Sequence, residues 1–321
     1  MNKRPRWTKI ISVVFFTILC ALLIINFQTV SDHISTAFYR PTAAVSEVET
    51  KLNLTGRAQI IFAASNPQLE TSDSFNAHCH SDDANTTILG CYSNRKIYVY
   101  NIEAAELSGI VESTMAHEFL HAAWERLSED ERTTLRPYLL QVYEENQTLL
   151  EKVMSAYDES EYLEELYTRC GTQIADLPEQ LESHYAKYFA DQDAVVAYYD
   201  SYIATFNDLS AQLDALAAEM DALGASITAA TASYNERSAS FGAAVEEFNN
   251  CAATVNCFNS YTFTTEHNRL VAEQNSLNAL YAQLDADISR YNQLVSDYNS
   301  NLLHSQNLQN LINSNSKVEQ I

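Results

Sequence analysis

The spacing of apolar residues predicts a small mixed domain in the first part of the chain. Residues 43–54 fit a short helix, and Gly56 is suited to cap its C-terminal end. The apolar runs 58–65 and 96–102 predict strands, the first of them buried. The segment 66–95 between these runs is rich in Asn, Asp, Ser and Thr, and it predicts a loop or a hairpin.

Helical patterns dominate the chain after residue 102. A helix is expected from about residue 107 to residue 127, and Ser128 with Glu131 forms a capping box for the next one. Further helical patterns cover residues 138–157, 161–171 and 178–191, the last of them beginning at Pro178.

From about residue 195 apolar residues recur every three or four positions in two long runs. Such heptad seams predict a coiled coil, and residues 249–268 separate the two runs as a tip. The simplest arrangement is an intramolecular antiparallel hairpin over residues 196–316, and a parallel dimer through one arm is the alternative. The seams include Leu209, Leu213, Leu216, Leu270, Leu277, Tyr281, Leu284 and Ile288.

The N-terminal segment has the pattern of a membrane anchor. Residues 1–9 are basic, and residues 10–28 contain an uncharged apolar run of nearly the length that a spanning helix needs. A cleaved signal peptide is the alternative, but no small-x-small cleavage site is evident. The basic residues before the run place the N-terminus in the cytoplasm and the bulk of the chain outside it. This arrangement favours a single-pass protein of a bacterial cell membrane.

Charge and cysteine spacing agree with an extracytoplasmic location. All 42 acidic residues and 15 of the 19 basic ones follow residue 28, so this part has a net charge of −27 and nucleic acid is excluded as a partner.

Two close cysteine pairs predict disulfides in an oxidising compartment; zinc binding by cysteines is disfavoured because no C-x2-C pair is present. The pairs are Cys79 with Cys91 and Cys251 with Cys257, and Cys170 is left as a buried free thiol.

The sequence HEFLH at residues 117–121 carries the main chemical signal. A spacing of four places His117 and His121 on one face of a helix, where both imidazoles can hold one metal ion. Glu118 can then reach a water on that metal as a general base. The other residues from 114 to 123 are uncharged, so two histidines and a glutamate in a buried helix need a partner such as a metal. The simpler alternative is a helix with two surface histidines.

This motif and the strand–loop–helix order around it resemble the zincin metallopeptidases over residues 43–195. The resemblance implies Zn²⁺ bound by His117 and His121, catalysis by Glu118, and a protein or peptide substrate. It also implies a sheet edge for extended substrate near the strand at 96–102. Metzincins carry Gly and His where this chain has Trp124 and Leu127, so the chain does not fit that subfamily. Aspzincins have the pattern G-T-x-D, whereas in the sequence GTQIAD at residues 171–176 the aspartate is displaced from that position.

A gluzincin-like arrangement, with a glutamate ligand on a later helix, remains. The sequence ELY followed by GT resembles third-ligand helices and favours Glu165; the alternatives are Glu164, Glu161, Glu182 and His184. Donors to the oxyanion are sought among Tyr167, His184 and Tyr185. His78 and His80 suggest a second metal site, although an exposed loop beside a disulfide is the simpler interpretation.

The expected fold class is α+β, mostly α: an N-terminal transmembrane helix, a small zincin-like domain over 43–195, and a long coiled-coil hairpin over 196–316. The expected function is that of a membrane-anchored zinc metallopeptidase. One alternative is a non-catalytic envelope or adhesion scaffold built on the hairpin. The other is a zinc amidase that acts on cell-wall peptides.

Overall fold

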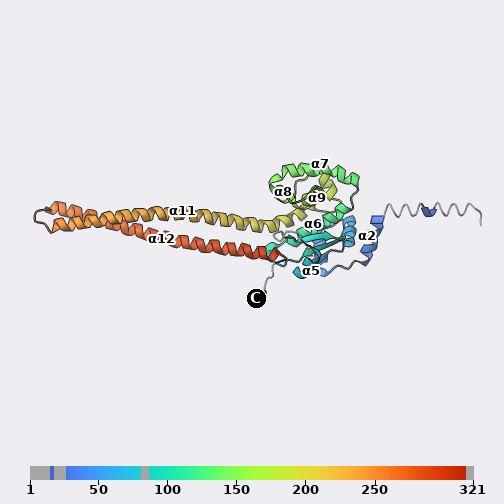
Figure 1. Ribbon diagram of the computed structural model, residues 1–321, viewed down its shortest axis with the longest axis horizontal. Helices are drawn as coiled ribbons and strands as arrows, with labels where there is room; N and C mark the ends of the chain where they lie inside the picture. Colours follow the sequence, from blue (N-terminus) through green and yellow to red (C-terminus); the bar gives the residue numbers. More distant parts are fainter. Residues whose placement is uncertain (1–14, 18–26, 81–86, 316–321) are drawn as a thin grey trace, which may run out of the picture. The chain divides into compact units, whose positions relative to one another are not determined.

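A computed structural model describes residues 15–17, 27–80 and 87–315 of the chain. These residues belong to two compact units (Figure 1). Unit 1 comprises residues 1–205 and 308–321, and unit 2 comprises Phe206–Asn307. Within the described residues no helix combines the length and apolar character needed to cross a membrane. The predicted cytoplasmic segment 1–9 and most of the predicted anchor 10–28 lie outside them.

Unit 1 begins with three helices, and two predictions for this region are wrong. Helix α2 covers Phe27–Phe38, α3 covers Ala43–Leu52 and α4 covers Gly56–Ala64. Asn53, not Gly56, caps α3 in the left-handed conformation. The expected strand at 58–65 is helix α4, because the Thr55 side chain accepts a hydrogen bond from the Ala58 amide and caps a helix there. The helix is buried on several sides, so its sequence lacks helical periodicity.

A three-stranded sheet lies against these helices. Strands β1 (Gln68–Glu70), β2 (Gly90–Ser93) and β3 (Lys96–Tyr100) are ordered β1-β3-β2, with β1 parallel and β2 antiparallel to β3. The predicted strand at 96–102 is therefore confirmed as β3, but it is central, and the sheet edge next to the helix with the HEFLH motif is β2. Asn94 and Arg95, both at positive φ, form the two-residue turn between β2 and β3.

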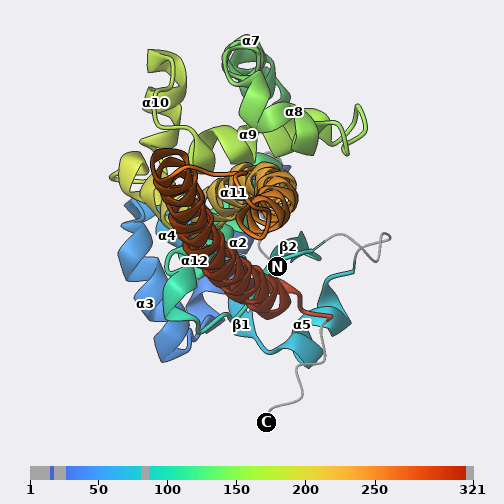
Figure 2. The same cartoon turned by 90° about the vertical axis from the view of Figure 1, so that its left-hand side faces the viewer.

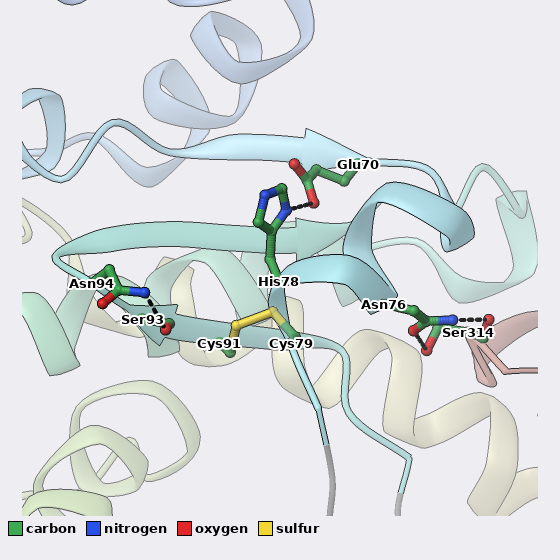
Figure 3. The surroundings of a disulfide bond; sticks show 8 residues. All are labelled: Glu70, Asn76, His78, Cys79, Cys91, Ser93, Asn94 and Ser314. Atoms are coloured by element: carbon green, nitrogen blue, oxygen red, sulfur yellow. Dashed lines mark hydrogen bonds and ion pairs between the residues drawn. A yellow bond between two sulfur atoms is a disulfide. The ribbon is translucent and has the colours of Figure 1, made fainter.

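The segment 66–95 contains more structure than a loop. Helix α5 (Ser72–His78) lies between β1 and β2, and the predicted disulfide Cys79–Cys91 joins its end to β2 (Figure 3). The end of the described chain also contacts α5, since Asn76 Nδ2 donates a hydrogen bond to the carbonyl of Ser314 at 2.8 Å. The covalent and hydrogen-bonded links hold α5 beside the sheet.

Helix α6 (Ile110–Glu125) is central to unit 1 and contains the HEFLH motif. It packs against β2, β3 and the later helix α9. The predicted capping box of Ser128 and Glu131 is present at the start of the next helix. The helices that follow α6 gather on the side of unit 1 away from β1 and α5 (Figure 2). They are α7 (Glu129–Glu145), α8 (Gln147–Met154), α9 (Tyr162–Gln173) and α10 (Glu179–Tyr185).

The predicted pair of long C-terminal helices is confirmed (Figure 1). Helices α11 (Gln192–Ala252) and α12 (Ser260–Ile312) supply unit 2, and the predicted disulfide Cys251–Cys257 joins them at the tip. Their cross-contacts run in opposite order along the two helices, so the pair is antiparallel; the contacts are Gln212–Asn301, Glu219–Arg290 and Arg237–Glu273. Leu209, Leu270, Leu277 and Leu284 of the predicted seam are buried, whereas Tyr281 and Ile288 remain exposed.

Candidate metal centre

The two motif histidines lie on one face of α6. The ring centroids of His117 and His121 are 5.0 Å apart, and their side chains are 16% and 18% exposed. The rest of α6 is largely buried in the core of unit 1. The two imidazoles are therefore partly exposed to solvent on a helix whose other side chains are mostly buried.

Helix α9 brings a carboxylate to the two imidazoles. Glu165 Oε2 lies 3.6 Å from His117 Nε2 and 3.5 Å from His121 Nε2, and the Glu165 side chain is only 4% exposed. Within the described residues this is the one group of three or more side chains with metal-ligand spacing. Ligand atoms around a tetrahedral zinc ion lie about 3.3 Å apart, so the observed distances fit a shared metal better than strong hydrogen bonds.

Gly171 lets α9 approach α6 this closely. A Cβ atom at Gly171 would lie 2.5 Å from Leu120 Cδ1, a side chain of α6 between the two histidines, and 2.6 Å from a ring carbon of Tyr185. A side chain at this position would require Leu120 and the ring of Tyr185 to shift. The glycine two turns after Glu165 thus helps to hold the carboxylate beside the imidazoles.

Glu164 contacts the outer side of the site. Its Oε1 atom is 2.8 Å from His121 Nδ1, so Nε2 is the ring nitrogen of His121 that faces Glu165 and could bind a metal. Burial lowers the pKa of His121, but the contacts with Glu164 and Glu165 outweigh it and raise the pKa to about 10. A metal cation bound to His121 in place of that proton would supply the positive charge that Glu164 and Glu165 favour at this position.

Glu118 is buried beside the histidines but is not one of the three grouped ligands. Its side chain faces Gly90 of β2, where an added Cβ would lie 2.7 Å from Glu118 Cγ. Burial raises the pKa of Glu118 above its ordinary value, while the charges of His117 and His121 oppose that shift. A carboxylate in this environment binds a proton more readily than one in water.

The other predicted candidates do not join this group. Glu161 and Glu182 are exposed, and His184 is buried with its Nε2 atom 3.1 Å from the Tyr167 hydroxyl. The Tyr185 hydroxyl donates to the Tyr167 carbonyl at 2.7 Å, so none of the three proposed oxyanion donors faces the imidazoles.

His78 and His80, for which a second metal site is the less favoured interpretation, make different contacts. His78 pairs with Glu70 at 3.0 Å (Figure 3). It also stacks on Tyr98, and both His78 and His80 are exposed. Within the described chain neither histidine belongs to a group with metal-ligand spacing. His78 instead helps to fix the end of α5 against the sheet.

Arg169 and Thr168 are two neighbours of the site that sequence reasoning missed. Arg169 Nη2 lies 2.6 Å from Glu165 Oε1, the carboxylate oxygen that faces away from the imidazoles. The Thr168 hydroxyl lies 3.4 Å from His117 Nε2. Burial opposes ionisation of Glu165, but His117, His121 and Arg169 together hold its pKa well below the usual range. The i,i+4 spacing of Glu165 and Arg169 is the sequence signal for this pair.

A comparison of the chain with protein families, curated proteins and solved structures finds no match. The chemistry of the site therefore rests on the motif and on the geometry of its side chains. Two imidazole nitrogens and one carboxylate oxygen could hold a metal ion, and a donor set of this type is found in zinc sites that keep a position for water or substrate.

Proposed function

We propose that the chain is a membrane-anchored, extracytoplasmic zinc metallopeptidase of the zincin type. The observation that carries this proposal is the convergence of His117 Nε2, His121 Nε2 and Glu165 Oε2, from two helices, at distances suited to one zinc ion. Glu118 lies next to His117 on the same buried helix. The arrangement supports a zinc hydrolase with two histidine ligands, one glutamate ligand and a separate glutamate base.

Each side chain has a distinct part in the proposed reaction. Zinc, when bound, lowers the pKa of a coordinated water and polarises the scissile carbonyl. Glu118 accepts the proton of that water and later delivers it to the leaving amine. Glu164 orients His121 through Nδ1, and Arg169 holds the oxygen of Glu165 that faces away from the histidines.

A peptide substrate is favoured by the position of β2. Among the described residues no strand pairs with the outer side of β2, and Gly90 of this strand lies over Glu118. An unpaired strand edge binds extended peptides through backbone hydrogen bonds. A peptide added to this edge passes close to the general base.

The proposed location rests on the sequence and on the disulfides. The uncharged run from Ile10 to Ile25 follows a basic segment, which predicts an anchor with a cytoplasmic N-terminus. The two disulfides agree with an oxidising compartment for the remainder of the chain.

The test is hydrolysis of a mixture of unfolded proteins by the full chain in detergent, with and without the Glu118→Gln substitution. We expect the variant to retain zinc and to lose activity by at least about a hundredfold, because only the proton acceptor is removed. Glu129→Gln, at an exposed position of α7, is the matched control and should remain active. Equal activity of the Glu118→Gln variant would contradict the proposal. Cleavage of cell-wall fragments but not of proteins would identify an amidase instead.

A further inference from the structure

Helix α2 has its apolar face turned away from the protein. Phe27, Val30, Ile34 and Phe38 follow one another at intervals of three and four residues, and their exposed fractions are 67%, 37%, 57% and 80%. We call these four residues the α2 stripe. A surface helix of a soluble domain normally packs such a stripe against the core. The stripe is thus an apolar surface that has no partner among the described residues.

The polar face of α2 is the one that packs against the rest of unit 1. Asp32 is 6% exposed, and it accepts hydrogen bonds from Arg126 Nε and Nη2, both at 2.8 Å. The Thr36 hydroxyl lies 3.2 Å from the Ile60 carbonyl of α4. Rolling α2 to bury its stripe would leave the buried guanidinium of Arg126 without its carboxylate, which is strongly unfavourable. These contacts fix the outward direction of the stripe.

We propose that the α2 stripe lies in the interface of a phospholipid membrane. The inference rests on the membrane anchor of the proposed function, because a single residue, Asn26, separates the uncharged run Ile10–Ile25 from the start of α2 in the sequence. A chain that leaves a bilayer at that point has α2 within reach of the headgroups. An amphipathic helix of this kind embeds its apolar face at the boundary of headgroups and acyl chains.

The charges around α2 also fit a membrane surface. Asp32 is the only acidic residue from 27 to 46 in a chain with 42 of them, and Arg126 neutralises it. Arg95 and Lys96 line a hollow of about 400 Å³ together with Ser35 and Phe38. Arg95 also lies 3.5 Å from Asp32 and 3.8 Å from Glu125. With Lys96 it places cations next to the apolar stripe, where the phosphate groups above acyl chains lie.

The stripe is linked to the catalytic helix through the Asp32–Arg126 pair. Arg126 directly follows the last residue of α6, whose side chains include the proposed zinc ligands. Contact of α2 with the membrane therefore positions α6 at a fixed depth near the bilayer surface. A catalytic helix at this depth favours substrates that lie close to the membrane.

The experiment adds one cysteine at a time to α2 in the full chain, with Cys20 replaced by serine and the buried free thiol Cys170 replaced by alanine. Ile34→Cys lies in the stripe, and Thr29→Cys lies at an exposed position about 140° around the helix from Ile34. Each is labelled with an environment-sensitive fluorophore and reconstituted in phosphatidylcholine vesicles. Quenching by spin-labelled lipid is compared with quenching by aqueous iodide. Vesicle flotation and zinc content are measured on the same samples.

We expect lipid quenching at position 34 to exceed that at position 29 by at least about threefold, with the reverse order for iodide. Equal iodide access at both positions in chains that float with the vesicles would overturn the proposal while leaving the anchor intact. Protection of position 34 from both quenchers would assign the stripe to a second copy of the chain and also overturn it. Chains that hold zinc but do not float would refute the anchor and the stripe together, without affecting the zinc site.

Discussion

Gly90 of β2 lies directly over Glu118 of α6, close enough that a Cβ at this position would come within 2.8 Å of the Glu118 Oε1 atom. The same Cβ would lie 2.7 Å from Thr114 Cγ2, one turn earlier on α6. The sheet edge and the proposed general base are therefore in direct contact. The disulfide at Cys91 holds this part of β2 to the end of α5.

Replacement of Gly90 by alanine should impair hydrolysis without removing zinc. The methyl group requires the side chains of Glu118 and Thr114 to shift, and the three atoms nearest to it belong to these two residues rather than to the proposed zinc ligands. We expect a loss of at least about tenfold in kcat/KM, since small displacements of a catalytic group reduce rates strongly. The measurement is kcat/KM together with zinc content.

Gly56→Ala is the matched control, because a Cβ at Gly56 meets nothing within 4 Å. This variant should retain both activity and zinc. Full activity of the Gly90→Ala variant would show that Glu118 tolerates displacement or is not the base.

Removal of the Glu164 carboxylate should weaken zinc binding. Glu164 accepts a hydrogen bond from His121 Nδ1 at 2.8 Å, and loss of such an outer partner lowers metal affinity by about 10- to 100-fold. Glu164→Ala should therefore bind zinc at least about tenfold more weakly in competition with a chromophoric chelator. Glu161→Ala, an exposed position just before α9, is the control. Equal affinities of the two variants would exclude this role of Glu164.

The stability of unit 1 should fall on acidification because of His184. Burial, aided by the charge of Lys187, lowers the pKa of this imidazole from 6.5 to about 4. The unfolded chain therefore binds a proton at higher pH than the folded chain does. The stabilisation is complete above about pH 6.5 and is lost as the pH falls towards 4, by on the order of 3 kcal/mol.

The measurement for His184 is urea unfolding between pH 7 and pH 4.5, with a chelator present so that metal release does not contribute. Trp124 fluorescence is a suitable signal, because its ring lies 5.0 Å from that of Tyr167, the hydrogen-bond partner of His184. His184→Gln cannot take up the proton, so its free energy of unfolding should depend less on pH. Parallel pH curves for the two proteins would contradict the assignment.

Features encoded by local spacing could be predicted from the sequence. The i,i+4 histidines of α6, the capping box at Ser128 and both disulfides depend on residues close together in the chain. The long helices also follow from their repeating apolar positions. In each case the periodicity or the pair of residues itself carries the information.

Features that depend on tertiary contacts could not be predicted. Helix α4 resembled a strand because the core surrounds it, which removes the alternation of buried and exposed positions. Glu164 and Glu165 are neighbours that point about 100° apart on α9, so their roles depend on which side faces α6. The contact between Gly171 and Leu120 determines that side. The meeting of Gly90 and Glu118 likewise depends on the packing of the sheet.

The central claim is that His117, His121 and Glu165 hold one zinc ion. It is tested most directly by the metal content of the full chain, purified without a histidine tag and offered zinc before excess metal is removed. The account predicts about one zinc per chain in the wild type and in the control His80→Ala, and a loss of that zinc in His117→Ala and Glu165→Gln. Absence of zinc from the wild type, or its retention in both site variants, would contradict the account.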